Sequence, residues 1–231
     1  MQERLVRKLD LERLLSQVKP HPTPNPDLEQ YTIPPDVAAT MLRIAAYTYG
    51  DITGKSILDL GCGTGRLALG AAFLSATRVV GIDLDKTAVT VAVDNSFKAG
   101  LRRRVEWVVA DIGVVCGKFD TVLQNPPYGV QKRGADRKFL EKALAAGKVV
   151  YSLHKGVYGG HVARELGIND RGVVPTSPSP FLERFIGEHG GRIRAVYAMA
   201  MTIPHMFSFH TRKKHSFIVD LYVIDVKSAE A

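Results

Sequence analysis

The chain is poor in cysteine and contains no long apolar run. Cys62 and Cys116 are the only cysteines among 231 residues, and they form no cluster with metal-ligand spacing. No stretch approaches the roughly 18–20 apolar residues of a membrane span, and the opening MQERLVRKLDLERLL lacks the apolar block of a signal peptide. These absences favour a reduced, cytoplasmic protein without a membrane segment or a metal site.

Acidic residues are outnumbered by basic ones. The sequence holds 31 Lys and Arg against 23 Asp and Glu, a formal net charge of +8. Such an excess favours a polyanionic partner such as nucleic acid, although a solvated basic face gives the same count. Hydrophobic residues make up 45% of the chain, which suffices for a full core.

The first 54 residues are predicted to form an extension that packs on the rest of the chain. Apolar residues at helical spacing over residues 5–18 indicate an amphipathic helix of about four to five turns. The prolines of residues 20–35 predict an extended loop. Asp36 is a candidate N-cap for a helix that runs to about Tyr49.

From residue 55 onward, short apolar runs alternate with helical stretches. Candidate strands are 56–60, 78–82, 105–109, 119–123, 148–153, 192–200 and 215–226, and candidate helices are 66–74, 86–99, 137–146 and 179–189. This alternation predicts an α/β fold over residues 55–231, with a mostly parallel sheet and helices on both faces. The last two strands have no helix between them and predict an antiparallel hairpin at one edge.

A glycine-rich turn follows the first candidate strand, in ILDLGCGTGRLALG (57–70). Gly61, Gly63 and Gly65 allow backbone N–H groups to approach a ligand at a helix N-terminus. A dinucleotide site would have a further glycine where Arg66 stands. The negative charge of Asp59 would repel a pyrophosphate at this place but could pair with a cation.

Acidic residues end the next two candidate strands. Asp83, in VVGIDLD, is placed to accept both ribose hydroxyls of an adenosine, and Asp85 is a candidate N-cap of the next helix. Asp111, in WVVAD, could accept a hydrogen bond from an adenine amine. Each acid alone could be a helix cap, but three at successive strand ends converge on one crevice.

This combination resembles the class I S-adenosylmethionine-dependent methyltransferases. The resemblance covers residues 55 to 155 and implies a Rossmann-like, seven-stranded sheet whose last two strands form the edge hairpin. It implies S-adenosylmethionine as cofactor, whose amino group and sulfonium account for Asp59. The cofactor-binding residues that it implies are Asp59, Gly61, Cys62, Gly63, Thr64, Asp83, Leu84, Asp111, Ile112 and Asn125.

The fourth candidate strand ends in QNPPYG, where a proline pair cannot continue a sheet ladder. Asn125 offers a side-chain oxygen and Pro126 a carbonyl, so together they could accept both N–H groups of a planar amine and aim its lone pair at a methyl group. Pro127 keeps the corner rigid, and Tyr128 offers a face for base stacking. These four residues are the predicted catalytic residues.

The [N/D]PP[Y/F] motif occurs in methyltransferases that act on adenine, cytosine or protein glutamine. Glutamine methyltransferases carry a separate helical substrate domain before the catalytic domain, whereas only about 54 residues precede the first strand here. A protein glutamine methyltransferase acting on a release factor and a non-catalytic RNA-binding relative remain the alternatives.

Further stretches resemble the methyltransferase-like protein 5 family over nearly the full chain. They are LEQY (28–31), KRGADRKFL (132–140), YSLHKG (151–156) and FSFHTRKKHSF (207–217). The resemblance implies methylation of one adenosine in small-subunit ribosomal RNA, with Gln30 and Tyr31 closing over the cofactor. It also implies a small zinc-binding activator protein as partner. The chain departs from the family at Ile33, where a threonine is usual, and in the longer segment 157–180.

Basic residues near the predicted substrate side are candidates for RNA contact. They could approach RNA phosphates, although solvated charged faces would look the same in the sequence. The candidates are Lys132, Arg133, Lys155, Arg212, Lys213 and Lys214.

Overall fold

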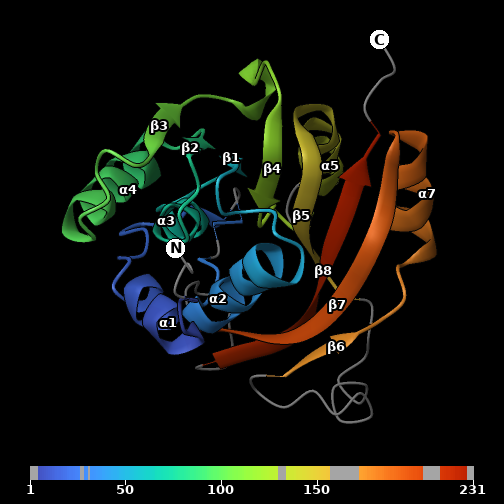
Figure 1. Cartoon of the computed structure of the whole chain (residues 1–231), viewed down its shortest axis with the longest axis horizontal. Helices are drawn as coiled ribbons and strands as arrows, with labels where there is room; N and C mark the ends of the chain where they lie inside the picture. Colours follow the sequence, from blue (N-terminus) through green and yellow to red (C-terminus); the bar gives the residue numbers. More distant parts are fainter. Residues whose placement is uncertain are drawn as a thin grey trace.

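The apolar runs form one twisted mixed sheet, and a computed structural model places helices on both of its faces (Figure 1). The structure describes residues 5–26, 29–30, 32–129, 134–156, 172–204 and 214–227. The strands are β1 Ser56–Leu60, β2 Arg78–Asp83, β3 Glu106–Val109, β4 Phe119–Gln124, β5 Gly147–Lys155, β6 Val173–Pro175, β7 Gly191–Pro204 and β8 Lys214–Val226. The α-helices are α1 Lys8–Ser16, α2 Pro35–Arg43, α3 Arg66–Phe73, α4 Lys86–Lys98, α5 Ala135–Ala146 and α7 Pro180–Glu188.

The strand order is β3-β2-β1-β4-β5-β8-β7-β6. Strands β1 to β5 pair in parallel, and β8 pairs antiparallel with both β5 and β7, which confirms the predicted Rossmann-like fold and the hairpin. The sheet has eight strands where seven were expected, because β6 pairs with the outer side of β7. This strand covers only three residues and ends in Pro175, which suits an edge position.

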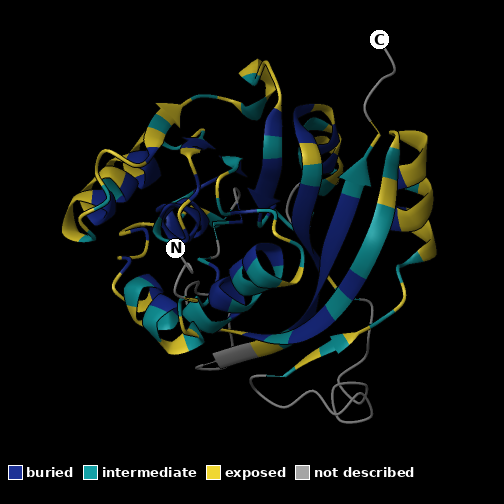
Figure 2. Cartoon of the chain, in the orientation of Figure 1, coloured by how far each residue is buried: buried dark blue, intermediate teal, exposed yellow. Residues whose placement is uncertain are grey.

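Two apolar layers flank the sheet. Helices α1, α2 and α3 share one core cluster with Leu153, Leu221 and Val223 of the sheet. Helices α5 and α7 share the other cluster with Tyr222 and Ile224. Successive residues of β8 thus alternate between the two layers, as the pleat of a strand requires, and the central strands are largely buried (Figure 2).

The N-terminal helices differ in detail from the prediction. Helix α1 has nine residues and is shorter than expected. Helix α2 begins at Pro35 after Pro34 as its N-cap, so Asp36 lies in the first turn and the predicted N-cap was wrong. Proline is favoured at the first helical position because its missing N–H needs no partner there. A π-helix over Ile44–Thr48 continues α2 to about the predicted end.

None of the helices in the described part of the chain is long and apolar enough to cross a membrane. Among the described residues there is likewise no group of three or more His, Cys, Asp or Glu side chains that could hold a metal ion.

Candidate functional site

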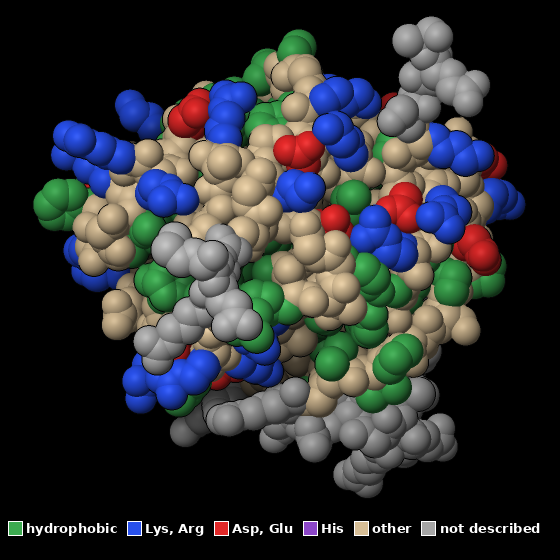
Figure 3. All heavy atoms as spheres, in the orientation of Figure 1, with side chains coloured by type: hydrophobic (Ala, Val, Ile, Leu, Met, Phe, Trp, Pro, Cys, Tyr) green, Lys and Arg blue, Asp and Glu red, His purple; other side chains and the backbone are tan. Residues whose placement is uncertain are grey.

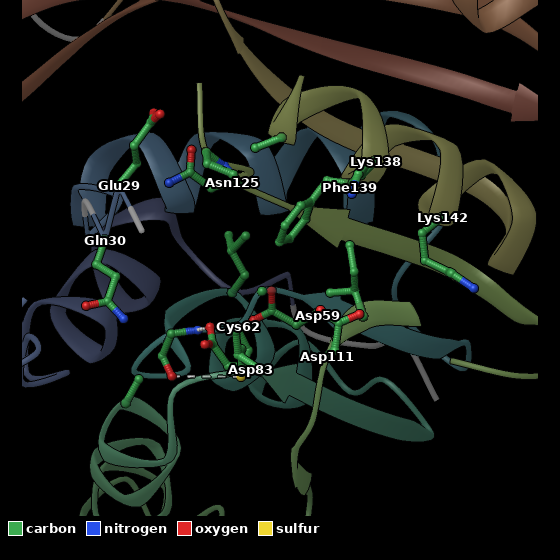
Figure 4. A pocket seen from close by; sticks show the side chains of 18 of the residues that line it. Glu29, Gln30, Asp59, Cys62, Asp83, Asp111, Asn125, Lys138, Phe139 and Lys142 are labelled. Atoms are coloured by element: carbon green, nitrogen blue, oxygen red, sulfur yellow. Dashed lines mark hydrogen bonds between the residues drawn. The ribbon is translucent and has the colours of Figure 1, made fainter. Parts of the chain in front are cut away.

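A cavity of about 730 Å³ opens at the carboxyl ends of the central strands (Figure 4). The described residues of the loop between α1 and α2, which are 17–26, 29–30 and 32–34 (the α1–α2 loop), form one wall of the cavity, and α5 contributes another. Most of the predicted site residues line it, namely Gln30, Asp59, Gly61, Cys62, Gly63, Thr64, Asp83, Leu84, Asp111, Ile112, Asn125 and Pro127. The carboxyl ends of the parallel strands and the adjoining loop therefore gather residues from separate motifs of the sequence.

The glycine turn between β1 and α3 is held tightly to β2. The N–H groups of Gly61 and Cys62 both donate to the carbonyl of Ile82, at 2.9 Å. Gly61 has a φ of 73°, and a Cβ at this position would lie 2.7 Å from the ring of Phe139 on α5. Only glycine fits there, because other residues rarely adopt this φ and the ring leaves no space for a side chain.

Asp59 lies beneath the glycine turn with 1% of its surface exposed. Its Oδ2 accepts a hydrogen bond from the N–H of Ala68 in α3, at 2.8 Å. Burial raises the pKa of the Asp59 carboxyl to about 7, and the nearby charge of Asp83 adds to this rise. A cation in the cavity would lower this pKa again, and the cation-facing role of Asp59 stays a prediction.

Asp83 ends β2 and braces two backbone segments. Its two oxygens accept hydrogen bonds from the N–H groups of Gly63, at 2.8 Å, and Asp85, at 2.9 Å. Burial raises the pKa of the Asp83 carboxyl. A carboxylate oxygen can accept a second bond, so Asp83 still has acceptor capacity toward the cavity.

Asp85 is the N-cap of α4, as predicted, and its Oδ1 accepts from Thr87 N–H and Ala88 N–H. Asp111 also caps, because it accepts from the N–H of Gly113 at 2.7 Å, ahead of a short 3-10 turn. Unlike Asp85, Asp111 lines the cavity. Asp111 therefore both caps the 3-10 turn and lines the cavity, so the two interpretations of this residue are compatible.

The corner after β4 presents Asn125 and Pro127 to the cavity. The hydroxyl of Tyr128 donates to Asn125 Oδ1 at 2.9 Å, and the Tyr128 ring packs edge-on against Phe217 with centroids 5.9 Å apart. Neither Tyr128 nor Pro126 is among the residues that line the cavity. Tyr128 therefore orients the Asn125 amide in this structure, while its stacking role stays a prediction.

A buried polar chain supports the corner from within the sheet. Gln124 Nε2 donates to Ser152 Oγ at 2.8 Å, and Ser152 Oγ lies 2.8 Å from His154 Nε2. Burial lowers the pKa of His154 to about 4, so the ring is neutral near pH 7 and its Nε2 can accept the Ser152 proton. The first bond holds Gln124, which directly precedes Asn125, and the second holds its partner Ser152.

The α1–α2 loop contributes residues that sequence reasoning missed. His21 and Glu29 line the cavity, and both are buried. Gln30 Nε2 donates to Asp85 Oδ2 at 2.7 Å, and His21 Nε2 lies 3.1 Å from the same oxygen. Glu29 belongs to the LEQY stretch already noted, whereas no local pattern marks His21.

Arg66 fastens this loop to the glycine turn. Its buried guanidinium donates to the carbonyls of Leu15, Val18 and Ile33, so the first residue of α3 holds both ends of the loop. Burial lowers the pKa of Arg66 to about 10. The residue that departs from the dinucleotide pattern therefore has a structural function of its own.

Several predicted residues lie outside the described residues, namely Tyr31, Lys132, Arg133, Arg212 and Lys213; the side chain of Lys214 is also outside them. Lys155 is described and is exposed at the end of β5. Figure 3 shows basic side chains spread over one face with acidic ones among them. The RNA-contact predictions therefore stay predictions.

The comparisons with known proteins agree with this geometry. The profile of the ribosomal protein L11 methyltransferase family (PrmA) matches residues 37–126, which hold the glycine turn and the strand-end acids. An uncharacterised protein of Methanocaldococcus jannaschii is 34% identical over 96% of this chain and 95% of its own length.

Two further relatives carry functional names. The rRNA N(6)-adenosine-methyltransferase Mettl5 of Drosophila melanogaster is 34% identical over 94% of this chain and 95% of its own length. The crystal structure of a candidate RNA methyltransferase from Pyrococcus horikoshii aligns with a TM-score of 0.80 and 34% identity, over 97% of this chain and 100% of that one. The chain therefore belongs to the family of the methyltransferase-like protein 5 enzymes.

Proposed function

We propose that this chain transfers a methyl group from S-adenosylmethionine to the exocyclic amine of an adenosine in ribosomal RNA, specifically that of the small subunit. The observation that carries the proposal is the position of Asn125. It stands on a rigid proline corner and lines the same cavity as the strand-end acids Asp59, Asp83 and Asp111. The name of the Drosophila relative supports the RNA substrate.

The cavity suits S-adenosylmethionine in size and in chemistry. Its volume lies within the range of about 300–1,000 Å³ that is usual for small-molecule sites. Three carboxylates would repel a phosphate-rich cofactor and suit a ligand with cationic groups. S-adenosylmethionine would supply an electrophilic methyl group there. Asp83 would accept from the ribose hydroxyls and Asp111 from the adenine, while Asp59 would face the cationic part.

The corner would orient the target amine rather than deprotonate it. An adenine amine is a weak nucleophile because its lone pair is delocalised into the ring. Asn125 Oδ1 and the carbonyl of Pro126 would accept its two N–H groups and draw the nitrogen towards tetrahedral geometry. Asn125 Oδ1 already accepts from Tyr128, but an amide oxygen has two lone pairs. The methylated nitrogen is acidic and can release its proton to water afterwards.

The substrate class can be tested with radiolabelled cofactor. The chain would be incubated with small ribosomal subunits, large ribosomal subunits and release factors in parallel. We expect label in the RNA of the small subunit. Label only in the glutamine of a release factor would overturn the proposal in favour of a protein glutamine methyltransferase. Failure to bind S-adenosylmethionine in a calorimetric titration would leave only a non-catalytic RNA-binding relative.

We further propose the RNA contacts and the division of the chain that the sequence indicated. Lys132, Arg133, Lys155 and the 212–214 cluster would approach RNA phosphates, which the exposure of Lys155 supports. Residues 1–54 would act as an extension on a catalytic domain of residues 55–231. Cytoplasmic localisation is supported by the two free cysteines.

A small zinc-binding activator protein is the partner that we propose from the family resemblance. Among the described residues β3 pairs with β2 and stands at the end of the sheet, so its outer edge is available to another strand. Val109, the last residue of β3, is 49% exposed and adds apolar surface to this strand. Purification of a fully active monomer would contradict this partner.

A further inference from the structure

Glu29 brings a buried carboxylate to the catalytic corner from a distant part of the chain. It belongs to the α1–α2 loop, lines the cavity and has only 6% of its surface exposed. Figure 4 shows Glu29 and Asn125 at the same end of the cavity, the first from the loop and the second from the end of β4.

The contact between loop and corner is a short hydrogen bond. Tyr128 N–H donates to Glu29 Oε2 at 2.7 Å, across 99 residues of sequence. Pro126 and Pro127 have no backbone N–H, so the N–H of Tyr128 is the first backbone donor that follows Asn125. A carboxylate acceptor makes this a charge-assisted bond, which is stronger than a neutral one. Glu29 therefore holds the corner at the first backbone donor after Asn125.

The backbone of Glu29 adopts a conformation that does not favour glutamate. Its φ is 49°, in the left-handed region, and its N–H donates to the carbonyl of Pro26 at 2.9 Å. A non-glycine residue is strained in this region because its Cβ crowds the following carbonyl oxygen, and burial of a carboxylate adds a further cost. Glycine would adopt this backbone conformation with less strain. The glutamate side chain must therefore contribute something that offsets the strain.

The neighbouring residue contacts the cofactor side of the cavity. Gln30 Nε2 donates to Asp85 Oδ2 at 2.7 Å, and Asp85 N–H donates to Asp83. Two successive residues of one loop therefore hold the catalytic corner and the predicted ribose site. A ligand that restricts the motion of this loop would therefore also restrict Tyr128 N–H through its bond to Glu29.

We propose that Glu29 is a positioning residue that couples the cofactor end of the cavity to the catalytic corner and so sets the direction of the Asn125 amide. This inference rests on the proposed function for its kinetic consequence, but the contact itself can be tested without RNA. Because Glu29 acts through the backbone of Tyr128, its loss lowers kcat far more than it weakens cofactor binding.

The direct test is amide hydrogen exchange at Tyr128, with and without S-adenosylmethionine. In the wild type we expect protection that increases with the cofactor. In Glu29→Ala we expect protection to fall at least about tenfold, as for loss of a hydrogen bond to a charged group, and to become insensitive to the cofactor. Glu188→Ala is the matched control, since Glu188 is an exposed glutamate at the end of α7. It should change neither quantity.

The turnover of three variants then distinguishes the contribution of the acceptor oxygen of Glu29 from those of its charge and of its backbone strain. We expect kcat to fall about a hundredfold in Glu29→Ala, as for a misplacement of about 1 Å, and less than about tenfold in Glu29→Gln, which keeps an acceptor oxygen. Glu29→Gly relieves the backbone but should be as impaired as Glu29→Ala. Thermal unfolding of each variant shows whether it is folded.

The two hypotheses fail in different ways. If the wild type places no methyl group on RNA, the proposed function is wrong, and Tyr128 exchange still decides the role of Glu29. If Glu29→Ala is folded and keeps either wild-type turnover or cofactor-dependent protection of Tyr128, the positioning role of Glu29 is wrong.

Discussion

The glycine turn and the α1–α2 loop form two walls of one cavity, but they are stabilised differently. Contacts of the glycine turn join residues close in sequence, as in Asp59 with Ala68, nine residues apart, and Gly63 with Asp83, 20 apart. Contacts of the loop span 55 residues from Gln30 to Asp85 and 99 from Glu29 to Tyr128. A local motif builds the first wall, whereas the whole fold must be in place to build the second.

The largest effect is expected at the corner where the two walls meet. Asn125→Ala removes the amide oxygen that we propose orients the target amine, and it should lower kcat by about 10²–10³, the range seen when a transition-state partner is removed. The cofactor affinity should change little, because the glycine turn stays intact. Single-turnover kinetics would measure the rate of methyl transfer, and calorimetry would measure the cofactor affinity. Turnover at the wild-type rate would refute the role of Asn125.

Arg66→Ala should detach the α1–α2 loop while the glycine turn remains. Three backbone carbonyls lose their donor, and we expect a loss on the order of 3 kcal/mol in the free energy of unfolding. Denaturant titration would measure it. The control is Arg104→Ala, since Arg104 is exposed and donates to the single carbonyl of Ala76. An equal loss of unfolding free energy in the two variants would show that the three contacts of Arg66 stabilise the protein no more than the single contact of Arg104 does.

Asp59 gives the glycine-turn wall a pH dependence. Its pKa is raised by burial to about 7, so below that pH the carboxyl is mostly protonated in the absence of ligand, whereas a cationic ligand favours the ionised form. Affinity for S-adenosylmethionine should therefore rise up to about tenfold between roughly pH 6 and pH 7.5. Asp59→Asn should remove most of the rise, with a remainder from Asp83, whose pKa is also raised. Calorimetry at several pH values would show a flat profile if Asp59 does not face the cation.

Tyr128→Phe should have the smallest effect. The ring and its edge-on contact with Phe217 remain, while the hydroxyl is lost together with its bond to Asn125 Oδ1 at 2.9 Å and its weaker contact with Met201 Sδ at 3.5 Å. A neutral hydrogen bond contributes about 0.5–1.5 kcal/mol, so kcat should fall roughly two- to tenfold with an unchanged fold. Stacking on the target base would appear instead in Tyr128→Leu, as a weaker RNA affinity in a binding titration.

The difference between the walls also explains what the sequence could predict. The positions of most strands along the chain, the cap at Asp85 and the lining acids follow from periodicity and from short motifs. The bond from Glu29 to Tyr128 and the three contacts of Arg66 could not be predicted, because no local pattern encodes contacts between distant segments. Strand β6 was missed since three residues ending in Pro175 carry no periodic signal.

The nucleoside composition of methylated RNA tests the central claim most directly. Small-subunit RNA would be incubated with the wild-type chain and S-adenosylmethionine, digested to nucleosides and analysed by mass spectrometry. The account predicts N6-methyladenosine as the new product, formed at one position and absent without the cofactor. A methyl group on another base or on another atom of adenine, or no methylated nucleoside with a chain that binds the cofactor, would contradict it.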